Sequence, residues 1–172
     1  MKISTPLTPS GMLPDLYGKF APEHAQIEGR PCVSFPIYIE SVPQGTMSLA
    51  LTFVDYDAVP VGGFCWIHWL ACNIDPNLTQ IPEDASARKS ITMVQGSNSD
   101  WSPLAGSCSN PDIIHRYAGP YPPDSAHEYT LTVYALDCML DLAEGYYLNE
   151  FRRAIKGHVV DKVEIEIPSR AF

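Results

Sequence analysis

The amino-acid sequence predicts a mainly antiparallel β-protein with one helix near its C-terminal end and one large loop over its surface. Its 16 prolines and 11 glycines interrupt the chain often, which favours short strands and long loops over a helical bundle. Several segments alternate between apolar and polar residues, the period of a strand, and only one shows the period of a helix. The length of 172 residues and the 45% hydrophobic content fit a single domain over residues 1–172.

Two apolar segments in the first half of the chain predict strands. Residues 47–54 alternate large apolar side chains with small or polar ones. Residues 64–74 are apolar on both faces, as expected of a central strand that is covered on both sides. Strict alternation places His68 of this second strand on the same face as Leu70 and Cys72.

The second half of the chain contains two further strands, the helix and the loop. Residues 128–137 and 160–167 alternate, and the later segment has one apolar and one charged face. Residues 147–155 carry an apolar stripe at helical spacing, and Gly157 is well placed to end that helix. Residues 95–126 contain five prolines and predict a long loop, and loops of this length are usually functional.

Charge, hydropathy and cysteine spacing narrow the classes of partner and location. A net charge of −9, without any cluster of Lys or Arg, argues against a nucleic-acid partner. No apolar run approaches the length of about 18 residues that a transmembrane helix needs, and the N-terminus has no apolar signal segment. Five cysteines without CxxC spacing indicate reduced thiols in a cytoplasmic protein. We expect no cofactor, and a homodimer stays open.

The first candidate site joins Asp55 and Asp57, which follow the first strand, with His68 of the second. Two close carboxylates repel, so they need a cation, a shared proton or N–H donors. A protonated His68 would meet that need, and its other N–H could hold an anion. Two alternatives stay open. The histidine can be an ordinary core residue beside turn-forming aspartates, or the three residues can bind Zn or Mn, although their spacing is not specific for a metal.

The second candidate site lies where the long loop enters the next strand. Gly119 and Pro120 predict a rigid turn that can expose a backbone N–H group, and His127 and Tyr129 share a face as the strand begins. A simple proline-rich turn with surface histidines explains the same residues. No GxSxG, HExxH, Walker or Rossmann pattern is present.

Three blocks in this order resemble a known family: "DYDAVP" (55–60), "WIHWLACNI" (66–74) and "YAGPYPPDSAHEYTLTVYALD" (117–137). They look like the signature blocks of the phosphatidylethanolamine-binding protein family, also called Raf kinase inhibitor-like, and most like its bacterial branch. The resemblance covers roughly residues 27–160. It implies an antiparallel β-sandwich with a C-terminal helix and a small anion-binding pocket at one end of the sheet.

In that family the pocket takes a phosphate or a phosphorylated head group. The matching positions of this chain are then the ligand-binding residues: Asp55, Asp57, His68, Gly119, His127 and Tyr129. Four positions depart from the family pattern, one of them Tyr121, which occupies a position usually held by cysteine or a small residue. Tyr56 and Val59 change the first block, and Glu128 stands where arginine is usual. These departures lead us to expect a reshaped pocket mouth and a different anion selectivity.

The resemblance implies a small-ligand-binding protein. A metal- or His/Asp-assisted hydrolase of a small phosphorylated molecule is the alternative, although no nucleophile is identifiable. A third reading is a regulator that binds a protein partner through its surface, which rests on analogy of fold alone.

Overall fold

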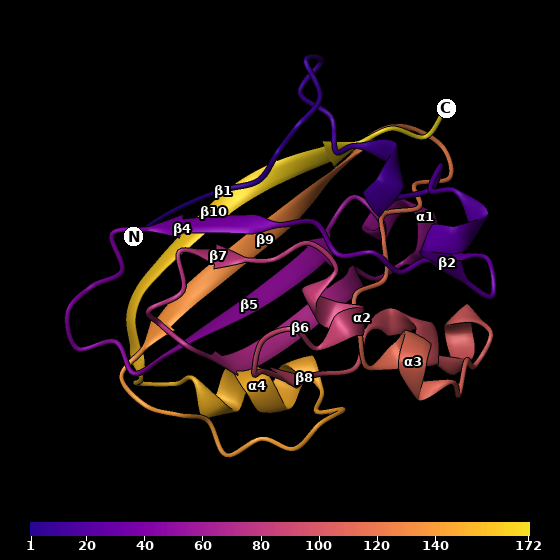
Figure 1. Cartoon of the computed structure of the whole chain (residues 1–172). Helices are drawn as coiled ribbons and strands as arrows, with labels where there is room; N and C mark the ends of the chain where they lie inside the picture. The colour runs from indigo at the N-terminus through magenta and orange to yellow at the C-terminus, as the bar shows by residue number, and fades with distance from the viewer.

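The computed structural model describes all residues from 1 to 172, and antiparallel strands form most of its regular structure (Figure 1). Five strands form the main sheet, in the order β10-β9-β5-β6-β8. In that order they are β10 (Val159–Ser169), β9 (His127–Leu136), β5 (Ser48–Asp55), β6 (Trp66–Ile74) and β8 (Val94–Gln95). All neighbouring strands are antiparallel. The four strands predicted from the sequence all lie in this sheet, so the predicted fold class is confirmed.

A smaller sheet packs against one face of the main sheet. It consists of β4 (Ile37–Glu40) between β1 (Lys2–Ser4) and β7 (Gln80–Ile81). A separate two-stranded ribbon contains β2 (Gln26–Ile27) and β3 (Arg30–Pro31). In β4, Ile37 and Ile39 are buried and Tyr38 and Glu40 are exposed, which is the alternation of a strand with one covered face. The two sheets form the expected β-sandwich.

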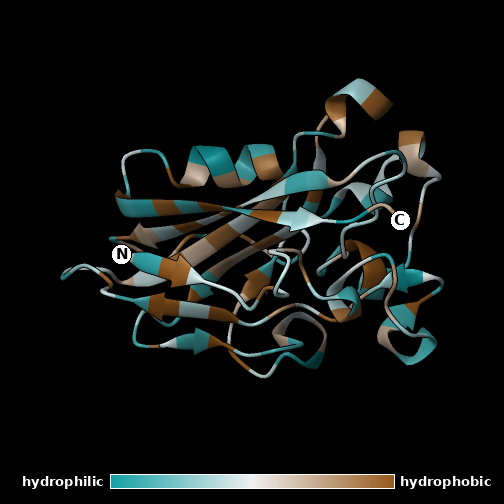
Figure 2. Cartoon of the chain, turned by 90° about the horizontal axis from the view of Figure 1, so that it is seen from above, coloured by the Kyte–Doolittle hydropathy of each residue, from teal (hydrophilic) through white to brown (hydrophobic).

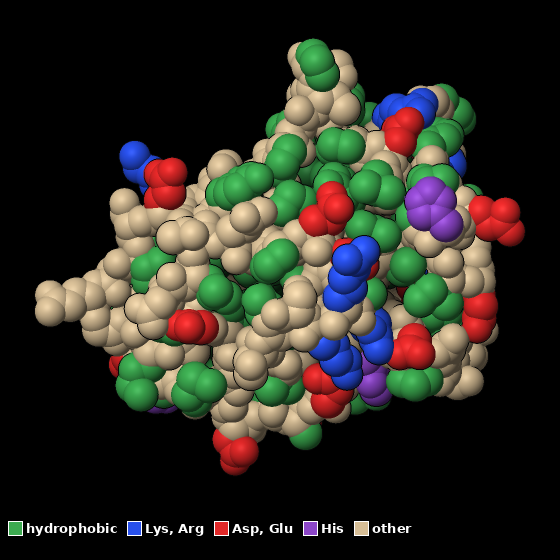
Figure 3. Space-filling view, viewed as in Figure 1, with side chains coloured by type: hydrophobic (Ala, Val, Ile, Leu, Met, Phe, Trp, Pro, Cys, Tyr) green, Lys and Arg blue, Asp and Glu red, His purple; other side chains and the backbone are tan.

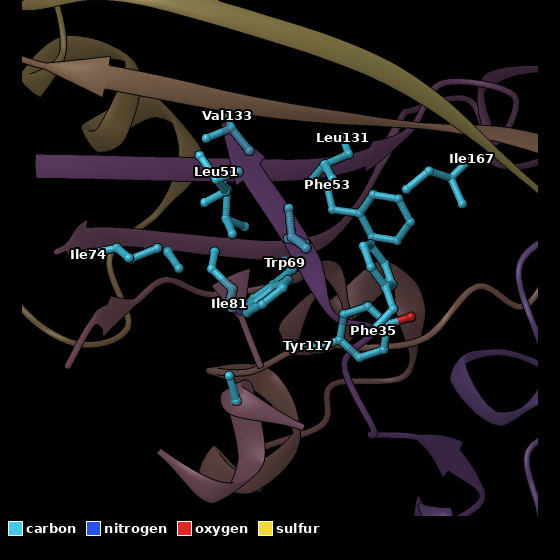
Figure 4. Packing of buried hydrophobic residues seen from close by; sticks show 14 of the residues in the cluster. Phe35, Leu51, Phe53, Trp69, Ile74, Ile81, Tyr117, Leu131, Val133 and Ile167 are labelled. Carbon is cyan, nitrogen blue, oxygen red and sulfur yellow. The ribbon is translucent and has the colours of Figure 1, made fainter. Parts of the chain in front are cut away.

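Aromatic rings fill the space between the two sheets (Figure 4). The Phe35 ring meets the Phe53 and Tyr117 rings edge-on, with centroids 5.2 and 5.7 Å apart, and Trp69 meets Tyr117 at 5.7 Å. Tyr117 donates its hydroxyl proton to the backbone carbonyl of Tyr17 at 2.6 Å, so this buried polar group is satisfied. The core therefore joins the loop before β9 to the N-terminal segment.

A helix covers the other face of the main sheet, as Figure 2 shows. This helix, α4 (Leu148–Ala154), places the fully buried Phe151 in one apolar cluster with Ala50 and Leu70 of the strands below it. Gly157 follows the helix with a φ of +86°, a conformation that favours glycine. The predicted helix and its glycine stop are both confirmed.

A β-bulge interrupts the pairing of β5 with β6. Phe53 pairs with Trp69, but the next residue of β5, Val54, pairs with Ile67. His68 is therefore the extra residue on β6 and has no register partner on β5. A bulge of this kind inserts one residue and resets the alternation of side chains beyond it.

The bulge overturns the predicted orientation of His68. We expected His68 to share a face with Leu70 and Cys72, but these two side chains lie on the α4 side of the sheet. The His68 ring lies on the opposite side, 5.8 Å from the Phe53 ring and 5.0 Å from the Tyr129 ring. The prediction was wrong because strict alternation does not hold across a bulge.

The long loop contains short helical turns rather than regular strands or an unstructured tract. These turns are η3 (Ser99–Trp101), η4 (Pro103–Ala105) and α3 (Pro111–Ile114). The buried Asn98 side chain donates to the carbonyls of Ile113 and Arg116 at 2.7 and 2.9 Å, which fixes the two ends of the turn region together. The loop is therefore held in a defined conformation by its own hydrogen bonds.

Other short helical turns lie along the chain: η1 (Asp15–Tyr17), η2 (Glu23–Ala25), α1 (Val59–Gly62) and α2 (Ala85–Arg88). On the face seen in Figure 3, Lys and Arg side chains gather over α2, with acidic side chains beside them. None of the helices has the length and apolar character that would let it span a bilayer.

Candidate functional site

A cavity of about 470 Å³ opens where β5 ends and where β6 and β9 begin. Its volume is within the range of small-molecule sites. The lining comes from five separate parts of the chain: residues 28–31, residues 55–68, Asp100, residues 118–123 and residues 127–129. Five of the six predicted site residues line this cavity, namely Asp55, His68, Gly119, His127 and Tyr129.

Asp55 and His127 form a buried pair at the floor of the cavity. Asp55 is the last residue of β5, where β9 runs beside it, and its Oδ2 lies 2.8 Å from Nδ1 of His127. The other ring nitrogen, Nε2, lies 3.0 Å from Oδ1 of the exposed Asp124. Burial disfavours the charged form of His127, but the bonds to the two carboxylates outweigh it and raise its pKa. His127 is therefore held towards the imidazolium form.

His68 is held in a different way. Its ring Nδ1 donates to the carbonyl of Ala118 at 2.7 Å, and the Ala118 N–H donates to the His68 carbonyl at 2.9 Å. Complete burial lowers the pKa of His68 and favours the neutral ring. Because the proton of a neutral ring is then on Nδ1, Nε2 is an acceptor that a ligand can meet.

The expectation that two aspartates hold His68 is wrong. Asp55 turns to His127, as described above. Asp57 is exposed, does not line the cavity, and accepts the backbone N–H of Glu128 at 2.9 Å through its Oδ2. Both carboxylates instead bond residues of the adjacent strand β9, which pairs with β5 up to Asp55.

Gly119 contributes close packing rather than a free donor. Its N–H donates to the carbonyl of Pro31 at 2.9 Å, so the predicted exposed N–H is already engaged. A Cβ at this position would lie 2.4 Å from the carbonyl oxygen of Tyr17 and 2.6 Å from Cβ of Pro31. Only a residue without a side chain lets the loop approach the N-terminal segment this closely.

Tyr129 provides a hydroxyl group in the wall of the cavity. It is fully buried among aromatic rings, and the His127 ring lies 6.2 Å away. Burial and the nearby charge of Asp55 raise the pKa of the Tyr129 hydroxyl. The group therefore remains protonated and can donate a hydrogen bond.

Several lining residues were missed by the sequence reasoning. The most important is Arg30, whose Nε donates to Oδ1 of Asp100 at 3.0 Å at the cavity wall. Phe64 and Trp66 stack with centroids 6.3 Å apart and provide apolar surface. No motif surrounds Arg30 in the sequence, whereas both aromatic residues belong to the apolar segment that was predicted as a strand.

Three of the four departures from the family pattern lie outside the cavity lining, and the fourth, Tyr121, lines it. The side chains of Tyr56, Val59 and Glu128 are exposed. Val59 begins the short helix α1, and the neighbouring Val61 and Gly62 do line the cavity. Within the first block itself, only Asp55 and Ala58 line the cavity.

Residues 3–169 match the family model of phosphatidylethanolamine-binding protein. The chain is 51% identical over 158 residues to the uncharacterized protein YxkA of Bacillus subtilis (strain 168), covering 92% of this chain and 94% of that protein. It is 30% identical over 152 residues to a UPF0098 protein of Chlamydia pneumoniae, covering 87% and 89% of the two chains.

Two solved structures share the fold. A phosphatidylethanolamine-binding protein homologue from Chlamydia trachomatis superposes with a TM-score of 0.73 at 28% identity, over 92% of this chain and 89% of that one. YbcL of E. coli, described as a member of the mammalian phosphatidylethanolamine-binding protein family, gives a TM-score of 0.75 over 98% and 97% of the two chains. Its 22% identity bears on the fold alone.

Proposed function

The chain belongs to the phosphatidylethanolamine-binding protein family, and on this premise we propose that its cavity binds a small anionic ligand such as a phosphorylated head group. The observation that carries the proposal is that His127 and Arg30 line the same cavity of about 470 Å³. Both are cationic groups, and a guanidinium offers several N–H donors in one plane. The Tyr129 hydroxyl adds a neutral donor.

The carboxylates of the cavity favour an anion that keeps one proton. Asp55 and Asp100 line the wall and would repel a fully ionised phosphate. A phosphate monoester has a second pKa near 6, so near neutral pH part of it carries one P–OH group. That group can donate to Nε2 of the neutral His68 while the other oxygens accept from Arg30 and Tyr129. We therefore expect binding to weaken as the pH rises above about 7.

Calorimetric titration with inorganic phosphate and with phosphoethanolamine tests the proposal. Arg30→Gln should weaken binding by about tenfold, the effect of losing one charge-assisted hydrogen bond. Arg152→Gln, at an exposed arginine of α4, is the matched control and should bind as the native chain does. The absence of saturable binding to either compound, or equal losses in both variants, would overturn the proposal.

A hydrolase of phosphorylated small molecules is the second candidate, and the pair of Asp55 and His127 is the observation that favours it. A protonated histidine that is held by a carboxylate can act as a general acid towards a leaving group. Release of inorganic phosphate from phosphoethanolamine, lost in Asp55→Asn, would support this function. Binding without turnover would leave the ligand-binding proposal alone.

We also propose that residues 1–172 form a single domain and that the protein works in the cytoplasm. The five cysteines support a reducing compartment, because all of them are free thiols. Binding of a protein partner and formation of a homodimer are two further predictions. Light scattering coupled to gel filtration distinguishes the monomer from the dimer.

A further inference from the structure

Three side chains with metal-binding atoms meet at the end of β9 that lies away from the cavity. They are Asp137, Cys138 and His158, and one ligand atom of each lies within 4.8 Å of the others. Asp137 and Cys138 directly follow β9, and His158 directly precedes β10. The two strand ends meet at the lower left of Figure 1, far from α1. A strand of ten residues separates this cluster from the cavity by about 30 Å.

The backbone that carries this cluster is fixed by neighbouring strands. The Ser48 hydroxyl donates to the Cys138 carbonyl at 2.5 Å. The Asn73 side chain bonds both the N–H and the carbonyl of Leu140, at 2.8 and 2.9 Å. The Asp137 N–H donates to the His158 carbonyl at 3.1 Å, which joins the two halves of the cluster. These bonds fix the backbone that carries the three side chains.

We propose that Asp137, Cys138 and His158 bind a divalent transition-metal ion of the zinc type. Thiolate, imidazole and carboxylate are the three ligand types that Zn²⁺ takes, usually in a tetrahedron. In that geometry the ligand atoms lie roughly 3.3–3.8 Å apart, so three atoms within 4.8 Å need only small side-chain movements to close on an ion. A thiolate also selects against Mg²⁺ and Ca²⁺, which prefer oxygen ligands.

The exposure of the cluster fits an ion that keeps one solvent ligand. The Asp137 and His158 side chains are about half exposed, so ions can enter and water can fill the fourth position. His158 Nδ1 already lies 2.8 Å from Asp137 Oδ1, with a proton between them. A cation bound by the two groups would keep them together and add the Cys138 sulfur, which the bond between His158 and Asp137 does not use.

A metal ion here would close a long segment of the chain. Residues 139–157 connect the two halves of the cluster, and this segment carries α4, which covers one face of the main sheet. Because an ion that binds the folded state stabilises that state, the thermal unfolding midpoint should rise with Zn²⁺. The site would thus act as a clip between β9 and β10.

Titration of the full chain with Co²⁺ tests the proposal directly. The native chain should develop the near-ultraviolet charge-transfer band of a cobalt–thiolate bond and the visible bands of a tetrahedral ion, and Zn²⁺ should displace both. Cys138→Ser should lose the thiolate band, and His158→Asn should weaken binding by about tenfold or more, since even indirect partners of a metal change affinity that much. Cys108→Ser and His24→Gln are the matched controls and should behave as the native chain does.

Three results would overturn the proposal: no thiolate band in the native chain, a band that survives in Cys138→Ser, or equal losses in the His24→Gln control. If Cys138→Ser fails to fold, as judged by circular dichroism, His158→Asn decides the question alone. The rise of the unfolding midpoint with Zn²⁺ provides an independent readout, and it should be absent from His158→Asn.

Discussion

The two ends of strand β9 each present a histidine bonded to an aspartate at the same distance of 2.8 Å. At the cavity end, the His127 and Asp55 side chains are only 3% and 5% exposed. At the far end, His158 and Asp137 are 47% and 52% exposed. The two contacts have the same length, but the exposure of their side chains to water differs, and their contributions to stability differ with it.

Burial decides what each pair can do. Removing one member of a buried ion pair leaves a charge without its partner, which is strongly destabilising, whereas an exposed pair contributes little because water solvates both groups. The buried pair is therefore a permanent part of the cavity floor. The exposed pair is open to water, so an ion can reach its side chains.

The largest effect should follow from breaking the buried pair. Asp55→Ala is expected to lower the free energy of unfolding by about 3 kcal/mol, because the buried His127 loses its closest carboxylate. Asp137→Ala is the matched change at the exposed pair and should alter the free energy by less than about 1 kcal/mol in the absence of metal. Urea denaturation measures both. Equal losses would remove the distinction between the two ends.

Two glycine variants compare the cavity end and the exposed end of the sheet through steric overlap instead of charge. Gly119→Ala should cost about 2 kcal/mol, because its Cβ would overlap the backbone of Tyr17. Gly157→Ala, near the exposed pair, has open space around the new Cβ and should cost only about 1 kcal/mol, for its positive φ. Thermal or urea unfolding of the two variants tests this order, and a larger loss at Gly157 would contradict it.

The pH dependence of stability should separate the two cavity histidines. The folded-state pKa of His127 is raised, so its stabilising contribution is present below about pH 6.5 and is lost as the pH rises through that higher pKa. The folded-state pKa of His68 is lowered, so its contribution is present above about pH 6.5 and is lost as the pH falls towards that lower pKa. His127→Gln should flatten only the alkaline side of a plot of unfolding free energy against pH. A flattened acidic side would show that the two roles are exchanged.

The smallest effect should come from the second, exposed partner of His127. Asp124→Asn removes one of the two carboxylates that favour the charged ring, so the pKa of His127 should fall relative to the native chain. NMR titration of the ring signals measures this shift. Asp75→Asn, at an aspartate that bonds only within its own turn, is the control and should leave His127 unchanged. A larger shift in the control would mean that direct contact is not the cause.

The alternation of apolar and polar residues along the sequence was enough to predict the long strands of the main sheet. The sequences of β5, β9 and β10 alternate with the period of a strand, although β5 is buried along its whole length, and the stripe of α4 has helical spacing. The small sheet was missed because its strands are two to four residues long, too short to show a period. The turns of the long loop depend on bonds from Asn98 to residues far along the chain, which no local pattern reveals.

Five of the six predicted residues line one cavity, but the connections predicted between them were wrong. Sequence blocks brought Asp55, His68 and His127 into one group, and they do line one cavity. Which carboxylate meets which histidine depends on the bulge at His68 and on strand pairing, and both are set by tertiary packing. Cys138 was grouped with the other four reduced thiols, because His158, which lies near it in the structure, is distant in sequence.

The strand order of the main sheet also has a consequence for synthesis of the protein. The two central strands are made first as a hairpin, but β5 has β9 as its other neighbour, and β9 begins about 50 residues after β6 ends. At the usual translation rate of 5–20 residues per second, those residues take roughly 3–10 s to appear. For that time the ribosome-bound chain carries an apolar hairpin with an open edge, which is the period in which a chaperone has the most to protect.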